Sequence, residues 1–179
     1  MALLKGEEHP LSHSHAREHH QWIADNMDKG FIPKLEQLPR TIAATIEGNS
    51  VLFIHYHIEQ AKLNEHISKD PFSKIVEPSL DNLLSLFKES EESLICFGHH
   101  HPIHFFEDND TIFLNPGSLG CNSKATAPYS VVDIGKDKIA VRFEEVSYDN
   151  KKFLESYELL QVPERDFLIK VFHGNQLKP

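Results

Sequence analysis

Two short apolar runs joined by a helix-like segment constrain the fold most. Residues 51–57 begin Val-Leu-Phe-Ile and residues 93–97 read Ser-Leu-Ile-Cys-Phe, and such runs are typical of buried strands. Between them, residues 79–90 carry apolar side chains at helical spacing, with Ser79 in the N-cap position. This order predicts a strand–helix–strand crossover, with the two strands as parallel neighbours or close together in one sheet.

The other segments predict a mixed α/β chain. The turn composition of residues 47–50 predicts a β-hairpin with a strand over 41–46. Helices are expected at 14–30 (capped by Ser14 and ended by Gly30), 149–160 and 164–174, with a short turn or helix at 31–40. A long polar loop is expected at 59–77. After the crossover, a meander of strands is expected at 103–106, 111–115, 129–134 and 139–148. We expect a single domain over 1–179: a loop at 1–14, a core at 15–150 and closing helices at 151–179.

Composition excludes several classes of function. The chain of 179 residues has a net charge of −9 and a pI near 5.8, and it has no basic stripe, which disfavours binding to a nucleic-acid polymer. The two cysteines make no disulfide framework and fit a reducing, cytoplasmic location. No window has the roughly 18 apolar residues that a membrane span needs, and the N-terminus lacks a signal peptide.

Histidines follow both crossover strands. His55 comes directly after Val-Leu-Phe-Ile, and His99 and His101 come after Gly98. In an extended segment, His99 and His101 would point to one side and His100 to the other, while Gly98 would allow a sharp turn. Any single histidine of this kind is more often a hydrogen-bonded surface residue. Two strand ends at one sheet edge, however, would bring three imidazoles together, a ligand set that suits Zn, Fe, Ni or Cu.

The motifs of this region resemble a known family. "FGHHHPIHFF", "IFLNPGSLG" and "APYSVVDI" resemble the C-terminal signature of the calcineurin-like metallophosphoesterases, and more narrowly the small bacterial and archaeal phosphodiesterases. The resemblance covers about residues 35–148 and implies the C-terminal half of a metallophosphoesterase β-sandwich with a mixed sheet flanked by helices. The implied activity is hydrolysis of phosphomonoesters or phosphodiesters at a dinuclear centre.

The resemblance also implies roles for individual residues. His55 and His99 would bind one divalent ion and His101 the other, with Mn, Fe, Zn or Ni as candidates. His100 would fill the variable position. The substrate-binding or supporting residues would be His57, Gly98, Asn115, Gly117 and Ser118, although His57 fits a surface histidine equally well. The substrate would be a phosphorylated small molecule of unspecified identity.

The family's N-terminal metal motifs are missing. No Asp is followed two residues later by His, no Gly-Asp pair occurs, and neither Gly-Asn pair is followed by His. The catalytic residues are therefore unknown and expected outside this chain, which is interpreted as truncated at its N-terminus. Three histidines without a bridging carboxylate would hold metal weakly or hold fewer ions. A missing half would leave an apolar face, which predicts a homo-oligomer or association with that half.

Two alternatives to the enzyme remain open. One is a non-catalytic remnant that binds a partner chain, and the other is a histidine-rich metal-binding module. Separately, five histidines form an N-terminal cluster (His9, His13, His15, His19 and His20), in which His15 and His19 have the i, i+4 spacing of a helical zinc chelate. We interpret this cluster as a solvated helix face, with adventitious Zn or Ni binding as the other possibility.

Overall fold

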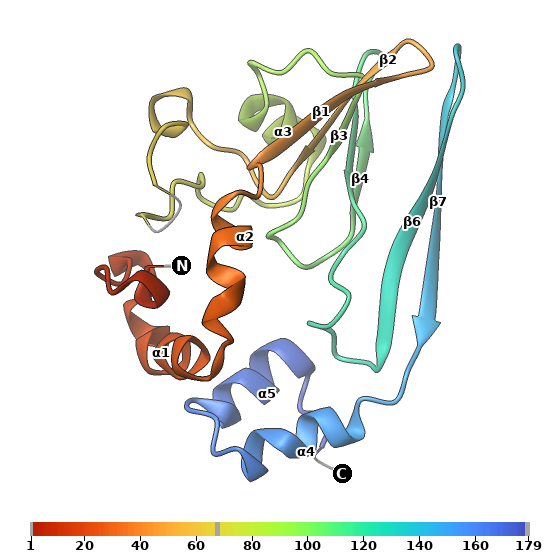
Figure 1. Ribbon diagram of the computed structural model, residues 1–179. Coiled ribbons are helices and arrows are strands. Elements are labelled where there is room, and N and C mark those ends of the chain that lie inside the picture. Colours follow the sequence, from red (N-terminus) through yellow and green to blue (C-terminus); the bar gives the residue numbers. More distant parts are fainter. Residues whose placement is uncertain (1, 67–68, 178–179) are drawn as a thin grey trace. The chain divides into compact units, whose positions relative to one another are not determined.

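The computed structural model describes residues 2–66 and 69–177 (Figure 1). Contacts within the chain divide it into two compact units, which we describe one at a time. Unit 1 comprises Met1–Leu38, Ile58–Phe72 and Asp149–Pro179, and unit 2 comprises Pro39–His57 and Ser73–Tyr148. The expectation of a single, truncated domain stays a prediction.

Unit 2 contains a five-stranded mixed sheet with the strand order β1-β2-β3-β5-β4. The strands are β1 (Thr41–Ile46), β2 (Asn49–Ile54), β3 (Leu94–Cys96), β4 (His104–Glu107) and β5 (Ile112–Asn115). β1 and β2 form the expected hairpin, and β2 and β3 are parallel neighbours. The connecting helix α3 (Leu80–Leu86) begins where Ser79 Oγ accepts a hydrogen bond of 3.2 Å from the Asn82 N–H. The mixed α/β class and the crossover are confirmed.

The meander expected after the crossover was wrong. β5 is the parallel neighbour of β3, and β4 lies beyond it at the edge, antiparallel to β5. Burial explains this order. Phe113, Leu114 and Asn115 of β5 are all buried, whereas buried and exposed residues alternate along much of β4. A run buried on both faces belongs inside a sheet, and an alternating run belongs at its edge.

A second sheet in unit 2 consists of β6 (Thr126–Ile134) and β7 (Ile139–Ser147), which pair along their full length (Figure 1). Ile139, Val141 and Phe143 alternate with exposed residues along β7, as the sequence predicts. These half-buried side chains pack on a buried cluster of Val51, Leu94 and Leu114. The apolar core of unit 2 therefore lies between the two sheets.

Unit 1 is helical. It contains α1 (Arg17–Asn26), α2 (Ile32–Glu36), α4 (Lys151–Leu159) and α5 (Arg165–His173), with 3-10 turns at Leu3–Lys5 (η1), Leu11–Ala16 (η2), Lys29–Phe31 (η3) and Gln60–Lys62 (η4). The described part of residues 1–14 therefore includes 3-10 turns and is not only the expected loop. Neither expected end of α1 was right: Ala16 is the N-cap because a 3-10 turn precedes the helix, and an extended Met27 ends it before Gly30. Gly174 ends α5 in a left-handed conformation, as expected.

The loop after β2 returns on itself through a single β-bridge between Ile58 and Phe72. Its expected irregular character is confirmed for its described part, which includes the short 3-10 turn η4. Within residues 2–66 and 69–177, no helix is both long enough and apolar enough to cross a membrane.

Candidate metal and phosphate site

The structure brings two of the predicted ligands together. His55 follows the last residue of β2, and His99 lies three residues after the end of β3. Because β2 and β3 are parallel neighbours, both ends open on the same sheet edge. His55 Nε2 and His99 Nδ1 are 3.0 Å apart, and their rings cross at 73°. The sequence-based pairing of these strand ends therefore matches the structure, while a role in metal binding stays a prediction.

The backbone reaches this geometry through a tight turn. The Gly98 N–H donates to His55 O, and the His100 N–H donates to Gly98 O, each at 2.8 Å. The second bond closes a three-residue turn around His99, whose φ is +67°. The expectation of an extended segment with the sharp bend at Gly98 was wrong, because His99 takes the left-handed conformation. A left-handed backbone conformation costs a non-glycine residue about 1–2 kcal/mol, and such strain tends to occur at functional sites.

His101, two residues after His99, is exposed. Partial burial lowers the pKa of His55, and repulsion from His101 lowers it further. Burial also lowers the pKa of His101, with a smaller contribution from His100. Both shifts favour the neutral imidazole, the state in which a ring nitrogen can bind a cation.

His100 is turned to a different partner. Its Nδ1 lies 2.9 Å from Nε2 of His104, which is only 2% exposed. His104 also packs against Phe97 with ring centroids 5.5 Å apart. His104 is therefore a buried structural residue, and the three consecutive histidines divide between the sheet edge and this pair.

Asn115 joins the histidine turn to the Asn-Pro-Gly-Ser turn. It is completely buried at the end of β5. Its Nδ2 donates to His100 O at 2.5 Å, and its Oδ1 accepts from the Gly117 N–H at 2.9 Å. One side chain therefore satisfies a backbone group in each turn. These bonds tie the two turns together, while a role of Asn115 in supporting a metal site stays a prediction.

Gly117 and Ser118 shape the second turn. Gly117 has φ of +90°, and an added Cβ would lie 3.1 Å from both Ile103 Cγ1 and Pro128 Cγ. Only glycine suits such a conformation beside such close neighbours. Ser118 Oγ accepts from the Cys121 N–H at 3.0 Å, which fixes the next bend of the chain. Both residues have structural roles beside the site.

His57 is held by a serine. Its Nδ1 lies 2.8 Å from Ser73 Oγ, and the Ser73 N–H donates to His57 O at 2.8 Å. His57 also stands edge-on to the buried Phe87 ring. This bonding fixes the orientation of the imidazole, but contact with a substrate phosphate stays a prediction.

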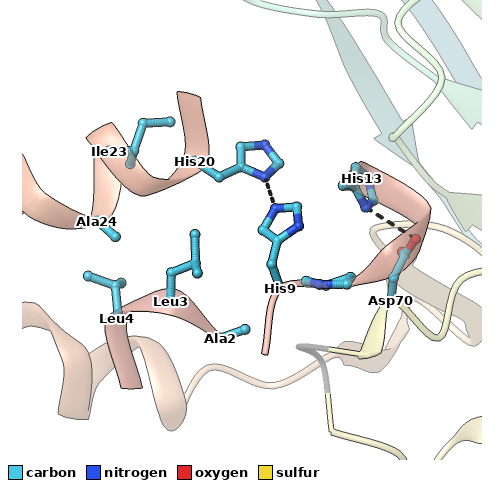
Figure 2. Close-up of a pocket in the computed structure, with 10 residues that line it drawn as sticks. Ala2, Leu3, Leu4, His9, His13, His20, Ile23, Ala24 and Asp70 are labelled. Carbon is cyan, nitrogen blue, oxygen red and sulfur yellow. Dashed lines mark hydrogen bonds and ion pairs between the residues drawn. The ribbon is translucent and has the colours of Figure 1, made fainter. Parts of the chain in front are cut away.

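A second group of histidines in unit 1 lies around a cavity of about 320 Å³ (Figure 2). His9 Nε2 and His20 Nδ1 are 2.8 Å apart, and His13 Nδ1 lies 3.5 Å from Asp70 Oδ2. Burial, followed by the charges of neighbouring histidines, lowers the pKa of both His9 and His20. The i, i+4 spacing of His15 and His19 does not place both residues on one helix, because His15 lies in η2 and His19 in α1. No local residue pattern predicts the contact between His9 and His20, because the 3-10 turn between them brings the two rings together.

The comparison with protein families decides the identity of this fold. Residues 9–137 match the calcineurin-like phosphoesterase superfamily domain. The chain belongs to this family. The match begins at residue 9 and thus includes the histidine-rich α1, which the motifs of residues 35–148 do not reach. No protein of curated function matches the chain.

Two solved structures show the same calcineurin-like fold. A hypothetical protein from Pyrococcus horikoshii OT3 is 19% identical, with a TM-score of 0.70 over 96% of this chain. A metallophosphoesterase from Sphaerobacter thermophilus is 18% identical, with a TM-score of 0.58 over 91% of this chain and 69% of its own length. The chain spans about 64% of the Pyrococcus protein.

The donor set fits the family's metal chemistry only in part. His55 and His99 present neighbouring ring nitrogens, which suit one divalent ion. Yet in the described part of the chain, no group of three or more His, Cys, Asp or Glu side chains is arranged to hold a metal. Because a dinuclear site also needs carboxylates between its ions, these residues alone do not complete it.

Proposed function

We propose that this chain takes part in metal-dependent hydrolysis of phosphoesters, either monoesters or diesters. The observation that carries the proposal is the 3.0 Å approach of His55 Nε2 to His99 Nδ1 at one sheet edge, in a chain of the calcineurin-like phosphoesterase family. A small phosphorylated molecule is the proposed substrate, because the chain is acidic and has no basic stripe for a polymer.

The proposed ligands divide between two divalent ions, with His55 and His99 on one and His101 on the other. Mn, Fe, Zn and Ni are the candidate metals. Two such ions, when bound, activate a water molecule and neutralise the phosphate oxygens. The chain's own contribution is to orient the imidazoles: the His99 turn and Asn115 hold the ligand segment, and Ser73 holds His57 beside it.

The proposal includes a source for the missing ligands. The sequence has no Asp-x-His, Gly-Asp or Gly-Asn-His motif, so we propose that the carboxylates come either from other Asp or Glu side chains of a second copy or from a separate N-terminal segment that carries the motifs. The DNA directly upstream of the Met1 codon offers a simple test. An in-frame stretch encoding the three motifs would support the proposal that the site extends beyond this chain.

A second candidate function is non-catalytic. The described residues hold no complete metal group, and large apolar side chains are exposed on α4 and α5, including Phe153, Leu159 and Val171. A fragment that binds a partner chain through such a surface would need no metal. A metal-binding module without turnover is the intermediate case.

The experiment measures metal content and hydrolysis of bis-p-nitrophenyl phosphate on the purified 179-residue chain, with and without Mn²⁺. We expect bound metal and weak, Mn²⁺-dependent turnover, since the ligand set is partial. His99→Ala and His101→Ala should each lower metal content and turnover by at least about tenfold, because each removes a direct ligand. His66→Ala, a change at an exposed histidine of unit 1, is the matched control.

Each outcome distinguishes one function. Metal bound through His99 without turnover would favour the metal-binding module. No metal together with a tight dimer or partner complex would favour the non-catalytic fragment. Metal content that is unchanged in both His99→Ala and His101→Ala would overturn the proposed ligands.

A further inference from the structure

The histidine cavity of unit 1 is independent of the sheet-edge site. Its lining comes from η1, the segment that follows it, η2, α1 and the loop before Pro71, and every one of these segments belongs to unit 1. His55, His99 and His101 all belong to unit 2. The proposed phosphoesterase function therefore makes no use of this cavity.

Four metal-ligating side chains lie on one side of the cavity. Figure 2 shows His20 from α1 facing His9, and His13 facing Asp70. The other side is apolar, with Leu3, Leu4 and Ile23 among its residues. Convergent polar groups in an otherwise apolar cavity are the usual composition of a ligand site.

We propose that this cavity binds one divalent transition-metal ion through His9, His20, His13 and Asp70. Three imidazoles and one carboxylate are ligands that Zn²⁺, Co²⁺ and Ni²⁺ accept. Asp70 supplies the negative charge that a neutral histidine set lacks, and the chain's net charge of −9 favours the accumulation of cations around it.

The distances within each pair already approach those of a coordination sphere. With metal–nitrogen bonds of about 2.1 Å, two imidazole nitrogens on one tetrahedral ion lie about 3.4 Å apart. His9 Nε2 and His20 Nδ1 are 2.8 Å apart, and His13 Nδ1 and Asp70 Oδ2 are 3.5 Å apart. In each pair the two donor atoms face each other, so the side chains must rotate for both donors to point at a common ion.

The two pairs have to close on each other. As the side chains stand in the described residues, no three of these donors surround one position. The His13 and His20 ring centroids are 5.9 Å apart, compared with 5.1 Å for His9 and His20. His13 lies at a kink inside η2, with φ of −114°, and Asp70 lies in a loop. Rotation of these two side chains requires no change in α1.

The test is a Co²⁺ titration of the full chain carrying His55→Ala and His99→Ala, followed by visible absorption. These two changes remove two of the three proposed sheet-edge ligands, including the only pair assigned to one ion, and they leave the residues of the cavity unaltered. We expect one ion to bind with the absorption of a four-coordinate site. A further His20→Gln or Asp70→Asn change should weaken binding at least about tenfold, whereas His15→Gln, which alters an exposed histidine outside the cavity, should leave it unchanged.

A measurement on the unaltered chain keeps the test independent of how variants fold. Zn²⁺ should shift the imidazole nitrogen resonances of His9, His13 and His20 together, at one equivalent. Shifts confined to His15 and His19 would indicate adventitious binding outside the cavity and overturn the proposal. No shift and no binding would overturn it too, and neither result would bear on phosphoester hydrolysis at His99.

Discussion

At the scale of single residues, Asn115 has the clearest energetic role. Its buried amide satisfies His100 O and the Gly117 N–H, both part of the turns beside the site. Asn115→Ala would leave both backbone groups without this partner. Since an unsatisfied buried group costs about 1–3 kcal/mol, we expect the free energy of unfolding, measured in urea, to fall by roughly 2–4 kcal/mol.

Asn49 provides the matched control. Its Nδ2 donates to Gly135 O at 2.9 Å, but in an exposed setting where water can replace the lost bond. Asn49→Ala should therefore cost no more than about 1 kcal/mol. If Asn115→Ala cost no more than Asn49→Ala, the bridging role of Asn115 would be wrong.

Single residues also show where sequence reasoning reached its limit. His55 and His99 could be paired from the sequence because each comes within three residues of the end of a strand of one crossover, and parallel strands end at the same edge. The left-handed His99 could not be predicted, since nothing in Gly-His-His-His distinguishes that residue from Gly98. The contact of His9 with His20 was equally hidden, because a 3-10 turn and not a helical repeat brings the two rings together.

At the scale of elements, two glycines in turns allow a controlled comparison. Gly117 and Gly48 have similar φ values, +90° and +87°. A Cβ at Gly48 would meet no atom within 4 Å, whereas a Cβ at Gly117 would lie 3.1 Å from Ile103 and Pro128 side-chain atoms. Both alanine variants bear the backbone cost of about 1–2 kcal/mol, and Gly117→Ala adds steric strain.

We therefore expect Gly117→Ala to lower the free energy of unfolding by roughly 2–4 kcal/mol and Gly48→Ala by about 1–2 kcal/mol. Denaturant unfolding of both variants against the unaltered chain measures the difference. Equal losses would mean that the turn gives way around Ile103 and that glycine is needed there for its φ alone.

The order of the strands marks the limit at this scale. The hairpin of β1 and β2 and the crossover to β3 follow from local turn and helix signals, which the sequence displays directly. The exchange of β4 and β5 is decided by which strand is buried on both faces, a property of the whole sheet. Local alternation could not show that β5 would lie between β3 and β4.

At the scale of the whole molecule, the shifted ionisable groups predict a pH range of maximum stability. Burial is the main cause that lowers the pKa of several histidines below their usual 6.5, namely His9, His19, His20, His55, His101 and His104. The folded chain thus binds fewer protons than the unfolded chain near pH 6. Stability then rises with pH, and it is lost as the pH falls below about 6.5.

The alkaline limit comes from Cys96. Burial raises the pKa of this thiol from 9.0 to about 11, so the unfolded chain loses the proton first and stability falls as the pH rises above about 9. On the acid side, the decline in net charge opposes the loss of stability, but this effect is weaker. Net charge declines from −9 toward zero near pH 5.8, which reduces repulsion, but salt at about 0.15 M screens exposed charges beyond about 8 Å.

We therefore expect the thermal midpoint, measured with EDTA at about 0.15 M salt, to be highest between about pH 7 and pH 9 and to fall toward pH 5.5. His104→Gln removes one of the histidines with a lowered pKa, and it should make the acid fall less steep. Because His104 is 2% exposed, its titration is coupled to unfolding more strictly than that of a surface histidine. A midpoint that stays constant or rises from pH 7.5 to pH 5.5 would show that loss of net charge outweighs the protonation of the buried imidazoles.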